Sequence, residues 1–207
     1  MKRGFAAVGI ILILLIFSIT ACQKEAVLAP EQKLASAVKT SQGYYEVDAD
    51  TANYLYRTEP NLIIIDASKS YVAGHLPNAI NIPADEIQSR LAEIDTSRTY
   101  LVYSDTEASS KAAAELIAAA SQSVYRLVGE YESWATQGYE LDTKKCHLTV
   151  GATPAAYAHI HVWCEEDAET KVFCITSDKC HSHRLLKSQN LATDGGPGPH
   201  NHYLGLN

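Results

Sequence analysis

Three His-x-His pairs near the end of the chain form its densest group of potential metal ligands. They are His159 with His161, His181 with His183, and His200 with His202. On a β-strand, residues two apart point to the same face, so each pair could present two imidazoles to one metal ion. Imidazole nitrogen suits zinc and copper. The pairs therefore predict a zinc or copper site, although their spacing matches no standard zinc-finger or zinc-ribbon pattern.

Four cysteines share this region and offer a second kind of chemistry, since thiols either pair as disulfides or bind metal. They are Cys146, Cys164, Cys174 and Cys180. In an oxidising compartment such a group predicts disulfides, and four cysteines allow three pairings. A disulfide-bonded region with surface histidines is thus the alternative to a metal site. Haem is a weaker alternative, because the spacing of Cys174 and Cys180 is too wide for the usual attachment motif.

The N-terminal residues have the features of a targeting segment. Lys2 and Arg3 precede an uncharged apolar run, residues 6–17, which has signal-peptide length and is short for a membrane span. The run leads into Ile-Thr-Ala-Cys, which resembles a bacterial lipobox with Cys22 as the acylated residue. We therefore predict an extracytoplasmic protein anchored to a membrane by lipid on Cys22. An uncleaved anchor and an ordinary secretory signal are the alternatives.

Charge limits the partners of the predicted mature protein. The whole chain has a net charge of −7, and removal of residues 1–21 would take away two cations and no acid, giving −9. Nucleic acid is therefore excluded as a partner, and we expect the membrane and a protein of the cell envelope instead. Gln23, which follows the predicted lipid-bearing cysteine, is compatible with the outer membrane if the host is Gram-negative.

The middle of the chain predicts an α/β domain that positions these groups. Short apolar runs predict strands, and amphipathic stretches between them predict helices. The strands are residues 62–65, 79–82, 99–103 and 124–128, and the helices begin after Asp48 and cover residues 85–94, 111–120 and 131–137. This alternation predicts a mostly parallel sheet covered on both faces.

Composition divides the chain into four parts. We predict a signal peptide (1–21), a tether (22–43), the α/β domain (44–143) and a Cys/His-rich region (144–207). In the last part, residues 157–164 alternate between polar and apolar types and predict a strand, with His159 and His161 on one face. Residues 171–176 predict a second strand that pairs with the first as a hairpin.

The α/β segment resembles the rhodanese family. Leu-Ile-Ile-Ile-Asp at 62–66, followed by Gly-His-Leu-Pro-Asn-Ala at 74–79, is similar to the family's first signature. Further on, Gly129, Trp134 and the pair Gly138-Tyr139 are similar to its closing "GG…W…GY" segment. The resemblance covers residues 44–143 and implies a three-layer fold with a central parallel sheet. His75, in the Gly-His turn, is interpreted as a structural residue.

The resemblance also locates the family's active-site loop, which carries a sulfur-transferring cysteine and reads Cys-x-x-Gly-x-Arg-Ser. In this chain the loop is Ser104, Asp105, Thr106, Glu107, Ala108, Ser109 and Ser110. A serine hydroxyl cannot carry a transferable sulfur. Two carboxylates also stand where the family holds an anion. We therefore predict no catalytic residue in this loop and a pseudoenzyme in which the fold is kept for binding.

Three functions remain open on these grounds. The first is a membrane-anchored accessory protein that docks an envelope partner, with an outer-membrane redox assembly suggested by architecture alone. The second is an extracytoplasmic sulfur or selenium transferase that uses one of the four C-terminal cysteines. The third is a metal-storage or delivery protein in which the α/β domain is a scaffold.

Overall fold

The computed structural model describes residues 28–69, 71, 74–153, 159–171, 173–174, 180–195 and 200–204. The predicted signal peptide and Cys22 lie outside these ranges. None of the described helices is long and apolar enough to cross a membrane. Helix α1 (Pro30–Ala35) lies in the predicted tether, and its Lys33 pairs with Asp48 at the start of the next helix.

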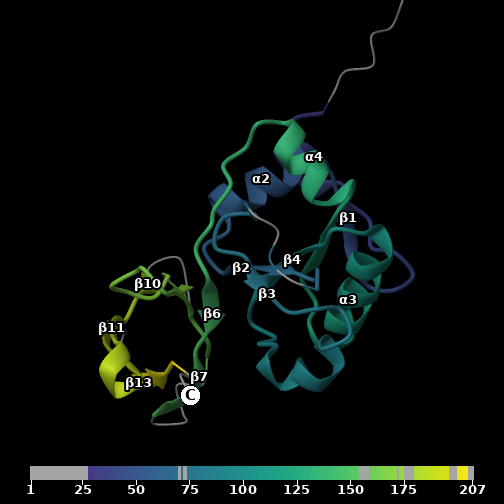
Figure 1. Cartoon of the computed structure of the whole chain (residues 1–207). Coiled ribbons are helices and arrows are strands. Elements are labelled where there is room, and N and C mark those ends of the chain that lie inside the picture. Colours follow the sequence, from purple (N-terminus) through teal and green to yellow (C-terminus); the bar gives the residue numbers. More distant parts are fainter. Residues whose placement is uncertain are drawn as a thin grey trace, which may run out of the picture.

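A five-stranded parallel sheet forms the centre of the larger part of the molecule, on the right in Figure 1. Its strands are β1 (Tyr45–Val47), β2 (Leu62–Asp66), β3 (Ile80–Asn81), β4 (Thr99–Tyr103) and β5 (Val124–Leu127). They follow the order β1-β5-β4-β2-β3, and all four pairings are parallel. The predicted α/β fold with a parallel sheet is therefore confirmed.

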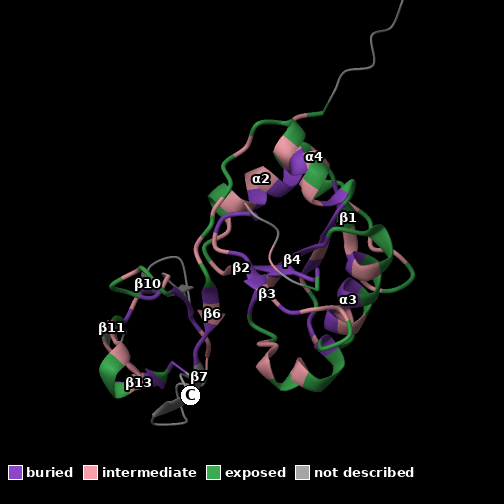
Figure 2. Cartoon of the chain, viewed as in Figure 1, coloured by how far each residue is buried: buried purple, intermediate pink, exposed green. Residues whose placement is uncertain are grey.

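Helices cover both faces of this sheet, because alternate residues of each strand point to opposite sides. Ile63 and Ile65 of β2 pack with the helices η1 (Ile87–Glu93) and α3 (Glu107–Ala120) on one face. Ile64 of the same strand packs with α2 (Ala49–Thr58) and α4 (Glu130–Thr136) on the other. Two apolar cores result, and Figure 2 shows the sheet between them as buried.

Helix starts in this domain follow from capping side chains. Asp48 caps α2 as predicted, because its carboxylate accepts a hydrogen bond from the Thr51 N–H. Helix α3 begins four residues before the predicted start at Lys111, since the Thr106 side chain accepts from the Ser109 N–H and caps it. The segment predicted as a helix over 85–94 is a 3₁₀-helix, η1.

Short antiparallel strands build the C-terminal region, on the left in Figure 1. A four-stranded sheet has the order β11-β12-β13-β7, and the pairs β6-β8 and β9-β10 lie apart from it. The bounds are β6 (Cys146–Leu148), β7 (Val150–Thr153), β8 (Val162–Cys164), β9 (Phe173–Cys174), β10 (Cys180–His181), β11 (Arg184–Leu186), η3 (Lys187–Gln189), β12 (Leu191–Gly195) and β13 (His200–Tyr203).

The predicted hairpin in this region is wrong. Strand β8 pairs with β6, and β9 pairs with β10. The two segments of the expected hairpin are joined by a backbone hydrogen bond from the Lys171 N–H to the Val162 carbonyl. Residues 159–161 precede β8 and are not in a strand, and residues 154–158 of the predicted strand lie outside the described residues.

The two parts share one hydrophobic core. Leu148 of β6 and Val162 of β8 are buried in the same cluster as Ile63 and Ile65 of the parallel sheet. The Tyr71 hydroxyl reinforces this joint by donating to the Ala79 carbonyl, 2.7 Å away, and accepting from the Cys146 N–H. The strand pair β6-β8 thus belongs structurally to the larger part, although it carries the C-terminal region.

Candidate functional site

Ser104 lies at the carboxyl end of β4, at the start of the loop that leads into α3. Its side chain is fully buried. The Ser104 hydroxyl donates to the Asp105 carboxylate at 3.0 Å and lies 3.5 Å from the Ser68 hydroxyl. These neighbours include no histidine or lysine that could take a proton from the hydroxyl. The position is therefore that of a satisfied polar residue and not of an activated nucleophile.

The chain's own oxygens occupy the backbone donors of this loop. The Ser104 N–H donates to Oε2 of Glu130 at 2.9 Å, and the Asp105 N–H donates to the Ser68 hydroxyl at 2.9 Å. Thr106 takes the Ser109 N–H as the cap of α3. Free N–H groups at a helix start commonly bind anions. Here an internal carboxylate takes the place that such an anion would need.

Glu130 was missed by sequence reasoning, although it follows Gly129 where the similar family has a second glycine. It adopts a φ of +58°, in the left-handed region that glycine tolerates and other residues rarely do. Its carboxylate also accepts hydrogen bonds from Ser110 at 2.7 Å and Arg126 at 2.8 Å. These contacts hold the strained backbone and draw the loop, α3 and β5 together.

A hollow beside the loop has an acidic lining. The residues that line it are Ser104, Asp105, Gly129, Glu130, Tyr131 and Glu132. Three of these six side chains are carboxylic acids. Such a lining repels an anionic sulfur donor and favours a cation or a neutral polar group. The loop therefore presents a serine and an acidic surface to this hollow.

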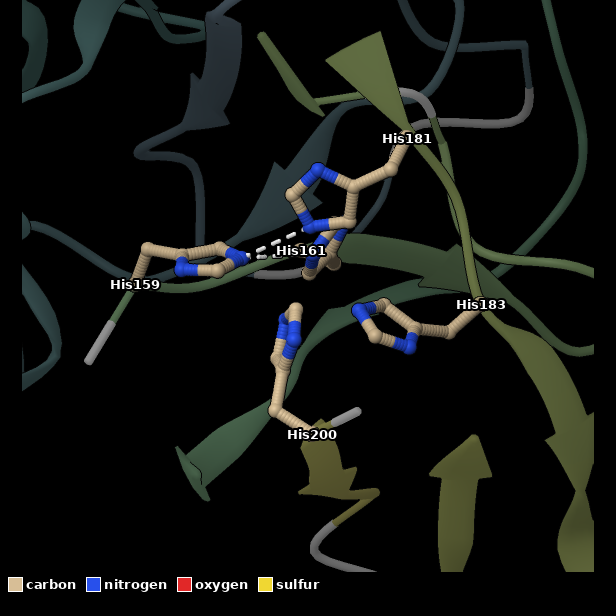
Figure 3. A group of neighbouring side chains, drawn as sticks. All are labelled: His159, His161, His181, His183 and His200. Atoms are coloured by element: carbon tan, nitrogen blue, oxygen red, sulfur yellow. Dashed lines mark hydrogen bonds between the residues drawn. The ribbon is translucent and has the colours of Figure 1, made fainter. Parts of the chain in front are cut away.

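The six histidines of the His-x-His pairs converge on one point in the C-terminal region. We call them the histidine cluster: His159, His161, His181, His183, His200 and His202. Five of them have imidazole nitrogens that all lie within 4.8 Å of one another. Figure 3 shows these five rings pointing toward a common centre. His202 joins them through ring contacts with His200 and His159 at 5.2 and 4.8 Å between centroids.

The histidines of the cluster come from different elements of the C-terminal region. His200 and His202 are two apart on β13 and so share a face, as predicted for a strand pair. His181 ends β10, and His183 follows in the link to β11. His159 and His161 come from the segment before β8. All are buried except His159, which is half-buried.

The nitrogens face one another in a way that suits a bound cation better than hydrogen bonding. Nε2 of His159 lies 3.1 Å from Nε2 of His161 and 3.0 Å from Nε2 of His181. A neutral imidazole has one donor nitrogen, so converging Nε2 atoms cannot all be satisfied by one another. Within the described part of the chain, both ring nitrogens of fully buried His183 lack a hydrogen-bond partner. Such a group is costly unless a ligand satisfies it.

The surroundings lower the pKa of four of these imidazoles and so favour their neutral form. Burial, with a contribution from neighbouring histidines, lowers the pKa of His159 and of His183 to about 3. Burial also lowers the pKa of His161 and His181. Nδ1 of His161 lies 3.1 Å from the Lys171 carbonyl, to which it can only donate, and this fixes its proton on the side away from the cluster.

The α/β part of this chain is similar to a known protein family. A family model described as the rhodanese-like domain matches residues 50–137. Residues 50–137 form a rhodanese-like domain. No match was found among curated proteins.

Several solved structures are similar to this chain over somewhat less than half of its length. The Alr3790 protein from Anabaena sp. is 24% identical, with a TM-score of 0.43 over 46% of this chain and 80% of that chain. A full-length protein from Lactobacillus plantarum is 24% identical, with a TM-score of 0.42 over 49% and 88%. The 3-mercaptopyruvate sulfotransferase SseA from Escherichia coli is 16% identical, with a TM-score of 0.41 over 48% and 50%.

The rhodanese-like domain holds one ligand segment of the cluster in place. The Arg98 guanidinium donates to the carbonyl of Ile160, the residue between His159 and His161. The Ile160 N–H donates to the Asp95 carboxylate at 3.3 Å. Both backbone groups of Ile160 are thus bound by the turn that precedes β4. Sequence reasoning missed this contact, because the residues are more than sixty positions apart.

Two of the four cysteines of this region pair across strands. Cys146 and Cys164 form a disulfide between β6 and β8, where they stand directly opposite each other. Of the three possible arrangements of the four cysteines, one contains this disulfide. The other pair in that arrangement is Cys174 with Cys180. The backbone register of β9 and β10 places these two residues opposite each other.

Proposed function

We propose that this chain is a metal-binding protein of the cell envelope in which the rhodanese-like domain is a non-enzymatic scaffold. The observation that carries the proposal is the histidine cluster, a set of six imidazoles that meet at one buried point. Buried ring nitrogens without a hydrogen-bond partner, such as those of His183, are unfavourable, whereas imidazoles are common ligands of first-row transition metals. The cluster thus has the donor set of a zinc, copper or related metal site.

Two features of the loop support a scaffold without sulfur transfer. Ser104 replaces the cysteine that the chemistry needs, and Glu130 occupies the backbone donor next to it. The contacts of Arg98 and Asp95 with Ile160 give the domain a different task, which is to fix the segment between two ligands. Rigid support of this kind is what a metal site requires from its surroundings.

The proposed location is the outer side of a bacterial membrane. The lipobox-like residues ending at Cys22 support a lipid anchor. A disulfide between Cys146 and Cys164 is typical of an oxidising compartment and supports export. A partner protein in the envelope is proposed on the same basis, because a tethered chain without catalytic chemistry acts through what it binds.

Elemental analysis of the purified chain after dialysis tests the metal-binding function. We expect stoichiometric transition metal in the wild type and its loss in the double variant His159→Ala/His161→Ala. The control is His147→Ala, which removes a half-buried histidine outside the cluster that contacts Glu165. Circular dichroism establishes that the variants fold. Absence of metal from the folded wild type, or equal metal in both variants, would refute the proposal.

A thiosulfate:cyanide assay tests the transferase alternative. We expect no turnover from the wild type. Turnover that survives Ser104→Ala but is lost in Cys174→Ser or Cys180→Ser would establish a sulfurtransferase that uses a C-terminal thiol. Counting reactive thiols in the unreduced protein adds an independent readout, because a transferase of this kind needs a free thiolate.

A further inference from the structure

The arrangement of the histidine cluster specifies its coordination geometry. Ring centroids of neighbouring histidines lie 4.6–5.2 Å apart, with planes inclined by 60–87°. Among these six described rings, each contacts every other ring except one. The pairs outside this set of contacts are His159 with His183, His161 with His200, and His181 with His202. Six points related in this way are the corners of an octahedron, with three opposite pairs.

The distances between donor atoms agree with this geometry. A metal–nitrogen bond of about 2.1 Å places adjacent ligands of an octahedron about 3.0 Å apart and those of a tetrahedron about 3.4 Å apart. The Nε2 atoms of His159 and His161 are 3.1 Å apart, and those of His159 and His181 are 3.0 Å apart. Opposite corners of such an octahedron are about 4.2 Å apart, and the ligand atoms of five members all lie within 4.8 Å of one another. One ion fills this space, and two ions do not.

We infer that the histidine cluster binds a single divalent ion through six imidazole nitrogens, and that the ion is one that prefers octahedral nitrogen coordination: Fe²⁺, Co²⁺ or Ni²⁺. This inference rests on the proposed metal-binding function and narrows it. Zinc in structural sites is four-coordinate, and Cu²⁺ prefers a tetragonal arrangement. Magnesium, calcium and manganese prefer oxygen ligands, which the cluster lacks. Of the three favoured ions, Ni²⁺ binds most tightly in the usual order of divalent metals.

A saturated centre restricts what the ion can do. Catalytic metals keep an open position for water or substrate, whereas structural metals have all positions filled by protein. With six imidazoles bound, no position remains at which water could be activated. The ion is held for storage, for structure or, if it is iron, for electron transfer without ligand exchange.

X-ray absorption of the whole purified chain loaded with Ni²⁺ or Co²⁺ tests the inference directly. We expect one ion per chain, six nitrogen neighbours at a single distance near that of metal–imidazole bonds, and for Co²⁺ the weak visible bands of an octahedral ion. In competition at equal concentrations, Ni²⁺ should displace Zn²⁺. Two ions per chain, four nitrogen neighbours, or intense tetrahedral Co²⁺ bands would overturn the inference and leave the proposed function standing. If no metal binds, both fail.

Removal of the sixth ligand provides a second readout. His202→Ala opens one position, so we expect a bound water, detected as enhanced water-proton relaxation by the paramagnetic ion, and a lower affinity. The wild type and His147→Ala should show no such enhancement. If His202→Ala does not fold, His202→Gln serves in its place, because glutamine fills most of the volume and binds metal poorly. Equal relaxation in the wild type and the ligand variant would show that the site is open already.

Discussion

At the scale of single residues, the proposed loss of sulfur chemistry involves more than the replacement of one nucleophile. Glu130 accepts hydrogen bonds from the Ser104 N–H, Ser110 and Arg126. Its backbone adopts an unfavourable left-handed conformation at this position. A glycine there would keep the backbone conformation without strain and would leave the loop donor available. The carboxylate thus closes the loop to anions from inside the protein.

This interpretation predicts that restoring the cysteine is insufficient. Ser104→Cys alone should show no thiosulfate:cyanide turnover, because the adjacent N–H remains bound by Glu130 and the lining stays acidic. Steady-state assays over a range of thiosulfate concentrations provide the measurement. Ser104→Cys combined with Glu130→Gly is the informative comparison, and it should bind sulfite or thiosulfate more tightly than the single variant. Full turnover by Ser104→Cys alone would show that Glu130 does not block the loop.

At the scale of elements, the turn between η1 and β4 connects the rhodanese-like domain to the histidine cluster. Arg98 is almost fully buried, and burial lowers its pKa to about 10, so the side chain stays charged at neutral pH. Its hydrogen bond to the Ile160 carbonyl and the contact of Asp95 with the Ile160 N–H fix this residue, which lies outside a strand, to the rhodanese-like domain.

We therefore predict that Arg98→Ala weakens metal binding without removing a ligand. The affinity should fall by roughly 10- to 100-fold, as is usual when support behind a metal ligand is lost. Isothermal titration with Ni²⁺ measures the change. Arg90→Ala is the matched control, because Arg90 forms a partly exposed ion pair with Glu93 in the neighbouring η1. Equal affinities of the two arginine variants would contradict a supporting role for Arg98.

The sequence predicted which residues form strands and helices better than it predicted which of these elements contact one another. Apolar runs and caps located the parallel strands and the start of α2, since these depend on neighbours in the chain. The three His-x-His pairs pointed to the histidines that lie together in the structure. The hairpin prediction was wrong because β8 pairs with β6, and this pairing buries Leu148 and Val162 in the main core. Glu130 and Arg98 act across long stretches of chain, so no local pattern indicated them.

At the scale of the whole molecule, the Cys146–Cys164 disulfide lies where the main core meets the C-terminal strands. It closes a loop with a sequence separation of 18 residues. Its two half-cystines are buried with residues of the parallel sheet. The cross-link therefore restricts the unfolded chain at the joint between the two parts.

Replacing both of these cysteines should destabilise the protein as a whole. For Cys146→Ser/Cys164→Ser we expect the free energy of unfolding to fall by about 3 kcal/mol, the value typical of a loop of this length. Urea unfolding followed by circular dichroism measures it. Reductant should lower the stability of the wild type toward that of the variant and leave the variant almost unchanged. A wild type that resists unfolding equally well with and without reductant would argue against this disulfide.

The shared core of the two parts has a consequence for the lifetime of the protein. Because β6 and β8 are buried with the parallel sheet, metal bound next to them stabilises more than the region that holds it. A ligand at a hundred times its dissociation constant adds about 2.7 kcal/mol to the folded state. Proteases act on the unfolded fraction, so the loaded chain would persist where the metal-free chain is degraded. The abundance of the protein would then follow the supply of the proposed metal.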